Sequence, residues 1–514
     1  EPSQSPTSSP TFRPSASPST TPTKFLEWFQ LGVDIDGDVA GDNCGSGVSL
    51  SKDGTRMAVG SPSSDDLAVD AGQVRMYEYD SGAGLWQQLG GDIYGEGSGD
   101  KIGTALSLSS DGSRVAIGAD KNDGSGPNAG HVRVFEYIAG TDSWDQVGSD
   151  IDGEADVDLS GRSVSLSDDG TRVAIGADFN DGGGANAGHV RVYESASSGG
   201  STWIQLGGDI DGEAGNDRFG ISVSLSGDGE SVAIGAHLND GSASNAGHVL
   251  VFRYVAGSET WTQQGLDIDG EAEEDRSGYY VSLSDDGSRV AMSSHRSDGG
   301  GADAGSVRIF EFQSVSSPWL QLGARIDGEA AGDLSGWSLS LSGSGERVAM
   351  GSQSNDDSGV DAGHVRVFEY VVGDASWVQV GADLDGEAAG DKSGLSVSLS
   401  RDGNRLAIGG PFNDANGADA GHVRVYQLPI HPTGEPSGAP SVSPSTLLSV
   451  TPSESPTSVP TSLPSVRPSD DPSGEPSGQP SVVPSHSPTV APTATPSVAP
   501  SGEPSGHPSG QPSV

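Results

Sequence analysis

The sequence predicts an all-β protein, a seven-bladed β-propeller of four-stranded antiparallel blades flanked by extended polyproline II segments. Three observations predict this fold: a regular tryptophan repeat, four alternating apolar runs in each repeat, and complementary ends of the repeat array. Repeats of this length, with four short strands each and no helical pattern, are typical of propeller blades. The tryptophans, spaced 58 or 59 residues apart, are Trp28, Trp86, Trp144, Trp203, Trp261, Trp319 and Trp377.

One repeat unit, which starts at Asp158, shows the four strands in order. The runs SVSLS, TRVAIGA, HVRVYE and TWIQLG alternate apolar with polar residues, and loops of Gly, Asp and Asn separate them. Strands crowd near the axis of a propeller, so the small side chains of SVSLS belong innermost and the Trp run outermost. The first two runs are joined by Asp-Gly, a strong hairpin signal, or once by Ser344-Gly345. The Asp-Gly pairs are Asp53-Gly54, Asp111-Gly112, Asp169-Gly170, Asp228-Gly229, Asp286-Gly287 and Asp402-Gly403.

The two ends of the repeat array complement each other. The array begins with an isolated outer strand, FLEWFQLG at 25–32, and ends with three strands that lack an outer partner. Adding the first strand to the last three would complete a seventh blade, close the ring and leave no sheet edge exposed. The sequence therefore predicts one propeller domain over residues 24–428.

The segments 1–23 and 429–514 are rich in Pro and Ser, and their prolines recur every four residues. Proline disfavours helix and central strand, so we expect polyproline II. Two interpretations stay open: an O-glycosylated stalk, or a disordered linker. The chain has no Asn-x-Ser/Thr sequon, so any sugar would be O-linked. The candidate glycosylation sites, with their adjacent prolines, are Ser437, Ser441, Ser473, Ser477, Ser481, Ser501, Ser505 and Ser509.

The charge of the chain restricts its partners. Asp and Glu number 72 against 26 Lys and Arg, which gives a net charge of −46. We therefore expect no nucleic acid and no anionic membrane as partner, but cations or basic proteins. No apolar run is long enough to cross a bilayer, so membrane insertion is not predicted. A single cysteine, Cys44, excludes an internal disulfide framework.

Acidic loops of the pattern DIDGE recur in all seven units and should gather on one face, together with the loops between the second and third strands. Carboxylates at alternating positions around a glycine suit Ca²⁺. Two other interpretations stay open: Asp-Gly simply makes the turn and the last Asp accepts hydrogen bonds from loop amides, or the face binds counterions or a basic partner diffusely. The candidate metal ligands are Asp34, Asp36, Asp38, Asp42, Asp150, Asp152, Glu154, Asp158, Asp383, Asp385, Glu387 and Asp391.

The unit from Gly215, GDRFGISVSLS followed by VAIGAHLNDGSASNAGHVLVFRY, resembles the FG-GAP repeat in its Trp-containing form. The same repeat builds the propeller of integrin α-subunits, and the resemblance covers about 24–428. It implies a propeller fold. Phe-Gly itself stands only at Phe219-Gly220, and the acidic loop that binds calcium in integrins is replaced by the Asp-Gly turn, so those ligands are not implied here. The Pro/Ser segments resemble those of algal cell-surface glycoproteins.

No set of residues in the repeats suggests a catalytic acid, base and nucleophile. The histidines at 131, 189, 248, 364 and 422 share one position before the third strand and are interpreted as structural. Our leading hypothesis is a non-enzymatic extracellular building block of a filament, matrix or cell wall, assembling with itself or with other extracellular glycoproteins. The alternative is a recognition propeller that binds a glycan or protein through its acidic face. A concave pocket lined by Tyr279, Tyr280 or Trp337 would favour recognition.

Overall fold

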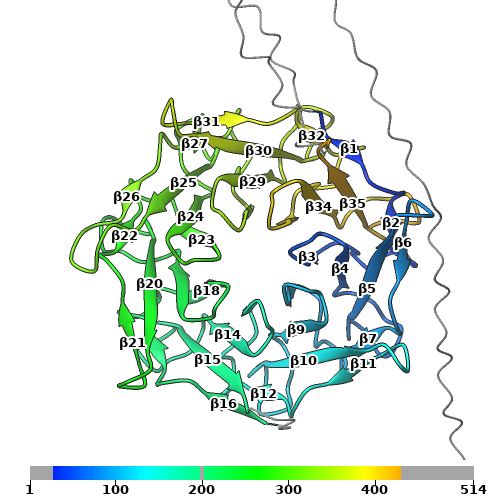
Figure 1. Cartoon of the computed structure of the whole chain (residues 1–514), viewed down its shortest axis with the longest axis horizontal. Helices are drawn as coiled ribbons and strands as arrows, with labels where there is room; N and C mark the ends of the chain where they lie inside the picture. Colours follow the sequence, from blue (N-terminus) through cyan, green and yellow to red (C-terminus); the bar gives the residue numbers. More distant parts are fainter. Residues whose placement is uncertain (1–26, 197–201, 430–514) are drawn as a thin grey trace, which may run out of the picture. The chain divides into compact units, whose positions relative to one another are not determined.

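The computed structural model describes residues 27–196 and 202–429. Every regular element in these two ranges is a β-strand, and the strands form seven sheets. Figure 1 shows the sheets arranged as blades of a ring about a central axis. The predicted seven-bladed propeller is confirmed. No helix in the described ranges is long and apolar enough to cross a membrane.

Each blade has its strands in chain order from the axis outward. The innermost strands are β3 (Gly47–Leu50), β8 (Ala105–Leu108), β13 (Ser163–Leu166), β18 (Phe219–Leu225), β23 (Ser277–Leu283), β28 (Ser338–Leu341) and β33 (Ser396–Leu399). The second strands are β4 (Arg56–Ser61), β9 (Arg114–Ala119), β14 (Arg172–Ala177), β19 (Ser231–Ala236), β24 (Arg289–Ser294), β29 (Arg347–Ser352) and β34 (Arg405–Gly410). The third strands are β5 (Gln73–Asp80), β10 (His131–Ile138), β15 (His189–Ser195), β20 (His248–Val255), β25 (Ser306–Glu311), β30 (His364–Val371) and β35 (His422–Gln427).

The outermost strands carry the repeated tryptophan or directly follow it. They are β6 (Leu85–Gln88), β11 (Ser143–Gln146), β16 (Trp203–Gln205), β21 (Thr260–Gln263), β26 (Leu320–Gln321), β31 (Ser376–Gln379) and, for the last blade, β1 (Phe29–Gln30). A fifth strand of two residues pairs with the third strand of each blade. These are β7 (Ile93–Tyr94), β12 (Ile151–Asp152), β17 (Ile210–Asp211), β22 (Ile268–Asp269), β27 (Ile326–Asp327), β32 (Leu384–Asp385) and β2 (Ile35–Asp36).

The fifth strand is a feature that the predicted four-stranded blade did not contain. Its first residue is a buried apolar side chain, as with Ile151, which pairs with Val132 of β10. The first half of the DIDGE motif is therefore sheet, and only the second half is loop. The apolar residue between two carboxylates explains why this half is a strand. In a strand, side chains point alternately to the buried and the exposed side, so apolar and polar residues alternate.

The seventh blade is assembled from both ends of the array, as predicted. Phe29 and Gln30 of β1 pair with Gln427 and Tyr426 of β35. The Leu31 N–H also donates to Val425 O at 2.7 Å. In Figure 1 the blue β1 lies beside the brown β35.

Two rings of side-chain hydrogen bonds join neighbouring blades. Near the axis, a serine of each inner strand accepts a hydrogen bond from the leucine N–H of the next inner strand, as Ser49 does from Leu108 at 3.1 Å, and the Ser398–Leu50 bond closes the circle. At the rim, each tryptophan Nε1 donates to a backbone carbonyl of the preceding blade, as Trp319 does to Gln264 at 2.8 Å. Serine at the hub and tryptophan at the rim therefore also bond the blades together.

On the face of the Asp-Gly turns, the axis is crossed by charged side chains. Lys52 and Arg401, from the first and last blades, form ion pairs with Asp168 and Asp285. The Lys52–Asp168 distance is 2.5 Å and the Arg401–Asp285 distance is 2.9 Å. The four side chains come from the first, third, fifth and seventh blades and meet at this end of the central channel. We call the opposite end, where the inner strands begin, the open end.

Candidate functional site

The acidic loops and the loops between the second and third strands lie on the same face, as predicted. Asn122 Nδ2, in a loop of the second kind, donates to Asp100 Oδ2 of an acidic loop at 3.1 Å. Equivalent bonds join Asn180 to Asp158 and Asn413 to Asp391, both at 3.0 Å.

The last carboxylate of each acidic loop holds the loop itself. Asp42, Asp158 and Asp391 are buried, and each accepts the backbone N–H three residues earlier at 3.0 Å. Asp158 and Asp391 also accept the asparagine bonds described above. The turn interpretation therefore accounts for these three residues, whose Oδ2 oxygens are already bonded within the loop.

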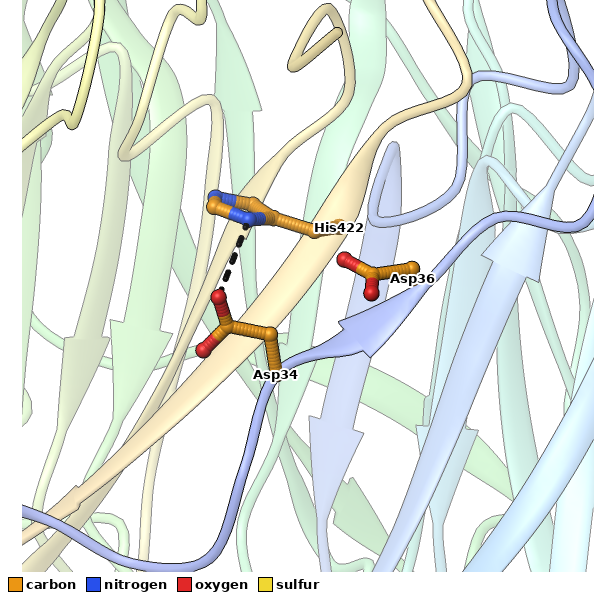
Figure 2. A group of neighbouring side chains, drawn as sticks. All are labelled: Asp34, Asp36 and His422. Atoms are coloured by element: carbon orange, nitrogen blue, oxygen red, sulfur yellow. Dashed lines mark ion pairs between the residues drawn. The ribbon is translucent and has the colours of Figure 1, made fainter. Parts of the chain in front are cut away.

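In five of the seven acidic loops the first carboxylate faces a histidine of its own blade. Asp34 Oδ2 lies 3.9 Å from His422 Nδ1, and Figure 2 shows the two side chains facing each other, with Asp36 nearby on β2. Asp150 and Asp383 occupy equivalent places, each within reach of a histidine and a glutamate. Asp152 and Asp385 follow on the fifth strands, as Asp36 does.

The third carboxylate reaches across to the next blade. Glu154 pairs with Arg191 at 3.4 Å, Glu387 pairs with Arg424 at 3.7 Å, and Asp38 pairs with Arg75. The candidate ligands of one loop are thus divided among three surroundings, and the groups that lie together come from two adjacent blades.

The sequence alone suggested only a structural role for the five repeated histidines. All five lie at the start of a third strand and are buried. Burial lowers the pKa of His189 to about 4, and the neighbouring Arg191 acts in the same direction. Their shared position in the repeat was the one sign in the sequence that they act together. Only the fold shows that each histidine faces two acidic loops.

A second group of residues lies at the open end of the central channel. The channel holds a cavity of about 420 Å³ lined by the inner strands. At the end of each acidic loop a glycine opens the inner strand; Gly161, for example, has φ +89°, and a Cβ on it would lie 2.5 Å from His131 O. The residue after this glycine lines the cavity, and we call the seven such residues the mouth ring. They are Ser46, Thr104, Arg162, Ile221, Tyr279, Trp337 and Leu395.

The mouth ring is strongly asymmetric although the blades are repeats. Tyr279 and Trp337 have ring centroids 5.1 Å apart, and both pack on His295, at 4.4 and 5.4 Å. His237 completes the group, 5.4 Å from Tyr279. Tyr279 and Trp337 are half-buried, whereas the two histidines are buried beneath them. Two adjacent blades thus present an aromatic surface to the cavity.

The second and third blades add a charged pair. Arg162 Nη1 lies 3.3 Å from Asp120 Oδ2. Burial raises the pKa of Asp178 to about 6, against the opposing effect of the guanidinium groups of Arg162 and Arg218. Burial likewise lowers the pKa of His237 and of His295 to about 3. At neutral pH both histidines are therefore uncharged.

A scan against family models matches residues 210–252 to the FG-GAP repeat. The chain is a seven-bladed propeller of the FG-GAP repeat type. The matched segment, from β17 to β20, includes Phe219-Gly220. The FG-GAP repeat type predicted from sequence is therefore confirmed.

Several solved structures resemble this chain, all with low sequence identity. The periplasmic gluconolactonase of Pseudomonas aeruginosa is 18% identical, with a TM-score of 0.46 over 67% of this chain and 86% of that one. The hydrazine synthase of Kuenenia stuttgartiensis is 14% identical, with a TM-score of 0.46 over 78% of this chain and 99% of that one. We draw no conclusion about activity from these likenesses. The search of curated proteins found no match.

Proposed function

We propose that this FG-GAP-type propeller is a non-enzymatic, extracellular recognition protein that binds a neutral saccharide at the open end of its central channel. The observation that carries this proposal is the aromatic surface that Tyr279 and Trp337 form at one side of the cavity. A concave pocket lined by a few atypical blades is the feature that favours recognition over a purely structural role.

The lining of the cavity fits a saccharide. Sugar rings have apolar C–H faces that pack on the electron-rich faces of aromatic side chains, and their hydroxyls need many small hydrogen-bonding partners. Tyr279 and Trp337 supply the first, and the serines of the inner strands supply the second with the hydrogen-bonding capacity that the protein leaves unused. Ser163 Oγ, for example, donates to Gly220 O and keeps its lone pairs for a sugar hydroxyl. Because Arg162 is paired with Asp120, the cavity offers no unpaired cation for an anionic sugar. A neutral sugar is therefore the better match.

Replacing Trp337 with alanine tests the proposal. The full chain would be applied to an array of neutral oligosaccharides, and the best binder measured by calorimetry. We expect Trp337→Ala to lower the affinity roughly tenfold or more, because a central aromatic anchor contributes about 2 kcal/mol or more to binding. Thr104→Ala, in the same mouth ring but three blades away from both aromatic residues, is the matched control and should bind as the parent does. Equal losses in both variants, or no binding on the array, would contradict the proposal.

A structural role is the second candidate, and the regular proline lattice of residues 429–514 favours it. In this role the propeller is a bead between glycosylated Pro/Ser rods that assemble into a filament, matrix or cell wall. The glycosylation candidates among Ser437 to Ser509 lie outside the described residues. The two roles are compatible, since a recognition domain can be carried on a rod.

Mass spectrometry of the native protein tests the structural role. We expect hydroxyproline and O-linked sugars on the Pro/Ser segments, because both are typical of extended stalks. The propeller peptides of the same digest are the control and should be unmodified. Bare segments throughout 429–514 would argue against a wall or matrix component.

A further inference from the structure

Five boundaries between blades repeat one cluster of three side chains. A histidine at the start of a third strand lies beside an aspartate of its own blade and a glutamate from the acidic loop of the preceding blade. We call these the inter-blade histidine clusters. Four of them bring their ligand atoms within 4.8 Å of one another: Glu96–His131–Asp150, Glu154–His189–Asp209, Glu213–His248–Asp267 and Glu329–His364–Asp383. In the fifth, His422 Nδ1 lies 3.9 Å from both Asp34 and Glu387 (Figure 2 shows Asp34 and His422).

All five histidines are buried, and four of them, His131, His248, His364 and His422, have a ring nitrogen without a hydrogen-bond partner in the described part of the chain. His364 is 0% exposed, and neither ring nitrogen has a partner in the described part of the chain; His422 is 1% exposed, and its Nδ1 has none. A buried polar group left unpaired is costly, so each such group needs an explanation. His364 Nδ1 lies 3.9 Å from Glu329 Oε2 of its cluster and 4.0 Å from Oδ1 of Asp385, the second carboxylate of the same loop as Asp383.

These distances are too long for hydrogen bonds but suit a shared cation. A tetrahedral zinc ion holds nitrogen and oxygen ligands at about 2.0–2.2 Å, so two of its ligands lie about 3.4 Å apart. The His364 separations of 3.9 and 4.0 Å exceed this by about 0.5 Å. A small rotation of the exposed Glu329 and Asp385 side chains closes that gap. Two independent observations therefore point to a cation: the three side chains lie close together, and a buried imidazole without a hydrogen-bond partner faces the carboxylates.

The two boundaries without histidine carry a substitute from the chain. Where Ser306 replaces the histidine, Arg325 replaces the aspartate, and its guanidinium lies 2.8 Å from Glu271 and 2.7 Å from Asp327. Where Gln73 replaces the histidine, its amide donates to Asp92 at 3.0 Å. At both boundaries that lack the histidine, a positively charged or hydrogen-bond-donating side chain of the protein therefore binds the carboxylates instead.

We propose that the inter-blade histidine clusters are binding sites for a divalent transition-metal cation of the Zn²⁺ class, each ion joining two adjacent blades. Imidazole with carboxylates is a donor set for such ions, whereas Ca²⁺ takes oxygen ligands. The three protein ligands leave further positions for water. This differs from the calcium loop that the sequence predicts, since the ligands come from two loops and a strand rather than from one loop.

The five sites should not be equal. An arginine two residues after the histidine competes for the glutamate in four of them, as Arg191 does for Glu154 at 3.4 Å. In the cluster of His248 that position is Leu250, so Glu213 and Asp267 face the imidazole without a competing cation from it. The Glu213–His248–Asp267 site should therefore bind most tightly.

Zinc titration of the metal-stripped full chain tests the proposal, at about 0.15 M NaCl so that loosely held counterions are screened. Calorimetry should give up to five Zn²⁺ per chain, with Ca²⁺ at the same concentration failing to compete. His248→Gln should remove the tightest site; Gln73 shows that the fold accepts glutamine at this position. Ser306→Ala, at a boundary without a cluster, is the matched control and should leave the stoichiometry unchanged.

A gain of binding provides an independent test. The double substitution Ser306→His and Arg325→Asp restores the repeat pattern at the fifth blade, and we expect one additional Zn²⁺ per chain. Cobalt in place of zinc should give visible absorption bands that weaken in His248→Gln. Zinc binding that Ca²⁺ displaces, or that neither His248→Gln nor the double variant alters, would overturn the proposal and assign the ions to surface carboxylates.

Discussion

Removing residues 1–31 is expected to lower the melting temperature of the propeller by roughly 5–10 °C. The deletion takes away β1, the Trp28 Nε1–Val380 O bond of 2.9 Å and the buried Leu31. Burial of two large side chains with their hydrogen bonds contributes roughly 5 kcal/mol, and each kcal/mol is worth about 1–2 °C in a domain of about 400 residues. Thermal unfolding followed by circular dichroism measures the change.

The matched control is a deletion of residues 1–23, which leaves the strand in place. We expect this shorter deletion to melt within a few degrees of the parent. The longer deletion should also aggregate more readily, because β35 then presents an unpaired edge. If both truncated chains melted alike, closure of the ring by β1 would contribute little to stability.

Acid is expected to destabilise the propeller through the histidines beneath the mouth ring. Burial holds the pKa of His237 and of His295 at about 3 in the folded chain, below the ordinary value of 6.5. Stability from a lowered pKa is complete above 6.5 and is lost as pH falls toward 3, because the unfolded chain binds the protons. Between pH 6.5 and 4.5 the loss is roughly 2 kcal/mol for each histidine.

Asp178 acts in the opposite direction. Burial raises its pKa to about 6, so its contribution is present below its ordinary value of 3.8 and is lost as pH rises through 6. Urea unfolding at pH 7 and pH 4.5 measures the net effect. The double variant His237→Gln and His295→Gln should lose much less stability over this range, and Gln353 shows that the fold accepts glutamine at the equivalent position of the next blade. An unchanged pH dependence would show that these two histidines are not the groups responsible.

Much of the candidate site could be predicted from the sequence, but its chemistry could not. The acidic loops, their shared face and the special character of Tyr279 and Trp337 all follow from comparing repeats. The histidines did not emerge as possible ligands, since a residue repeated in one position is usually structural. Their carboxylate partners, such as Glu154 and Asp209 for His189, come from two different repeats. Alignment of repeats compares equivalent positions and does not show which positions meet across a boundary.

The sequence by itself determined the number of blades, the order of strands within each blade and the closure by β1. These depend on spacing, alternation and side-chain size, which are local properties of the chain. Only the tertiary structure decided how the blades bond to one another. The Ser49–Leu108 and Trp319–Gln264 bonds each join residues in neighbouring repeats, 59 and 55 positions apart. The curvature of the ring brings such residues together, and it arises from packing the wedge-shaped sheets around a common axis.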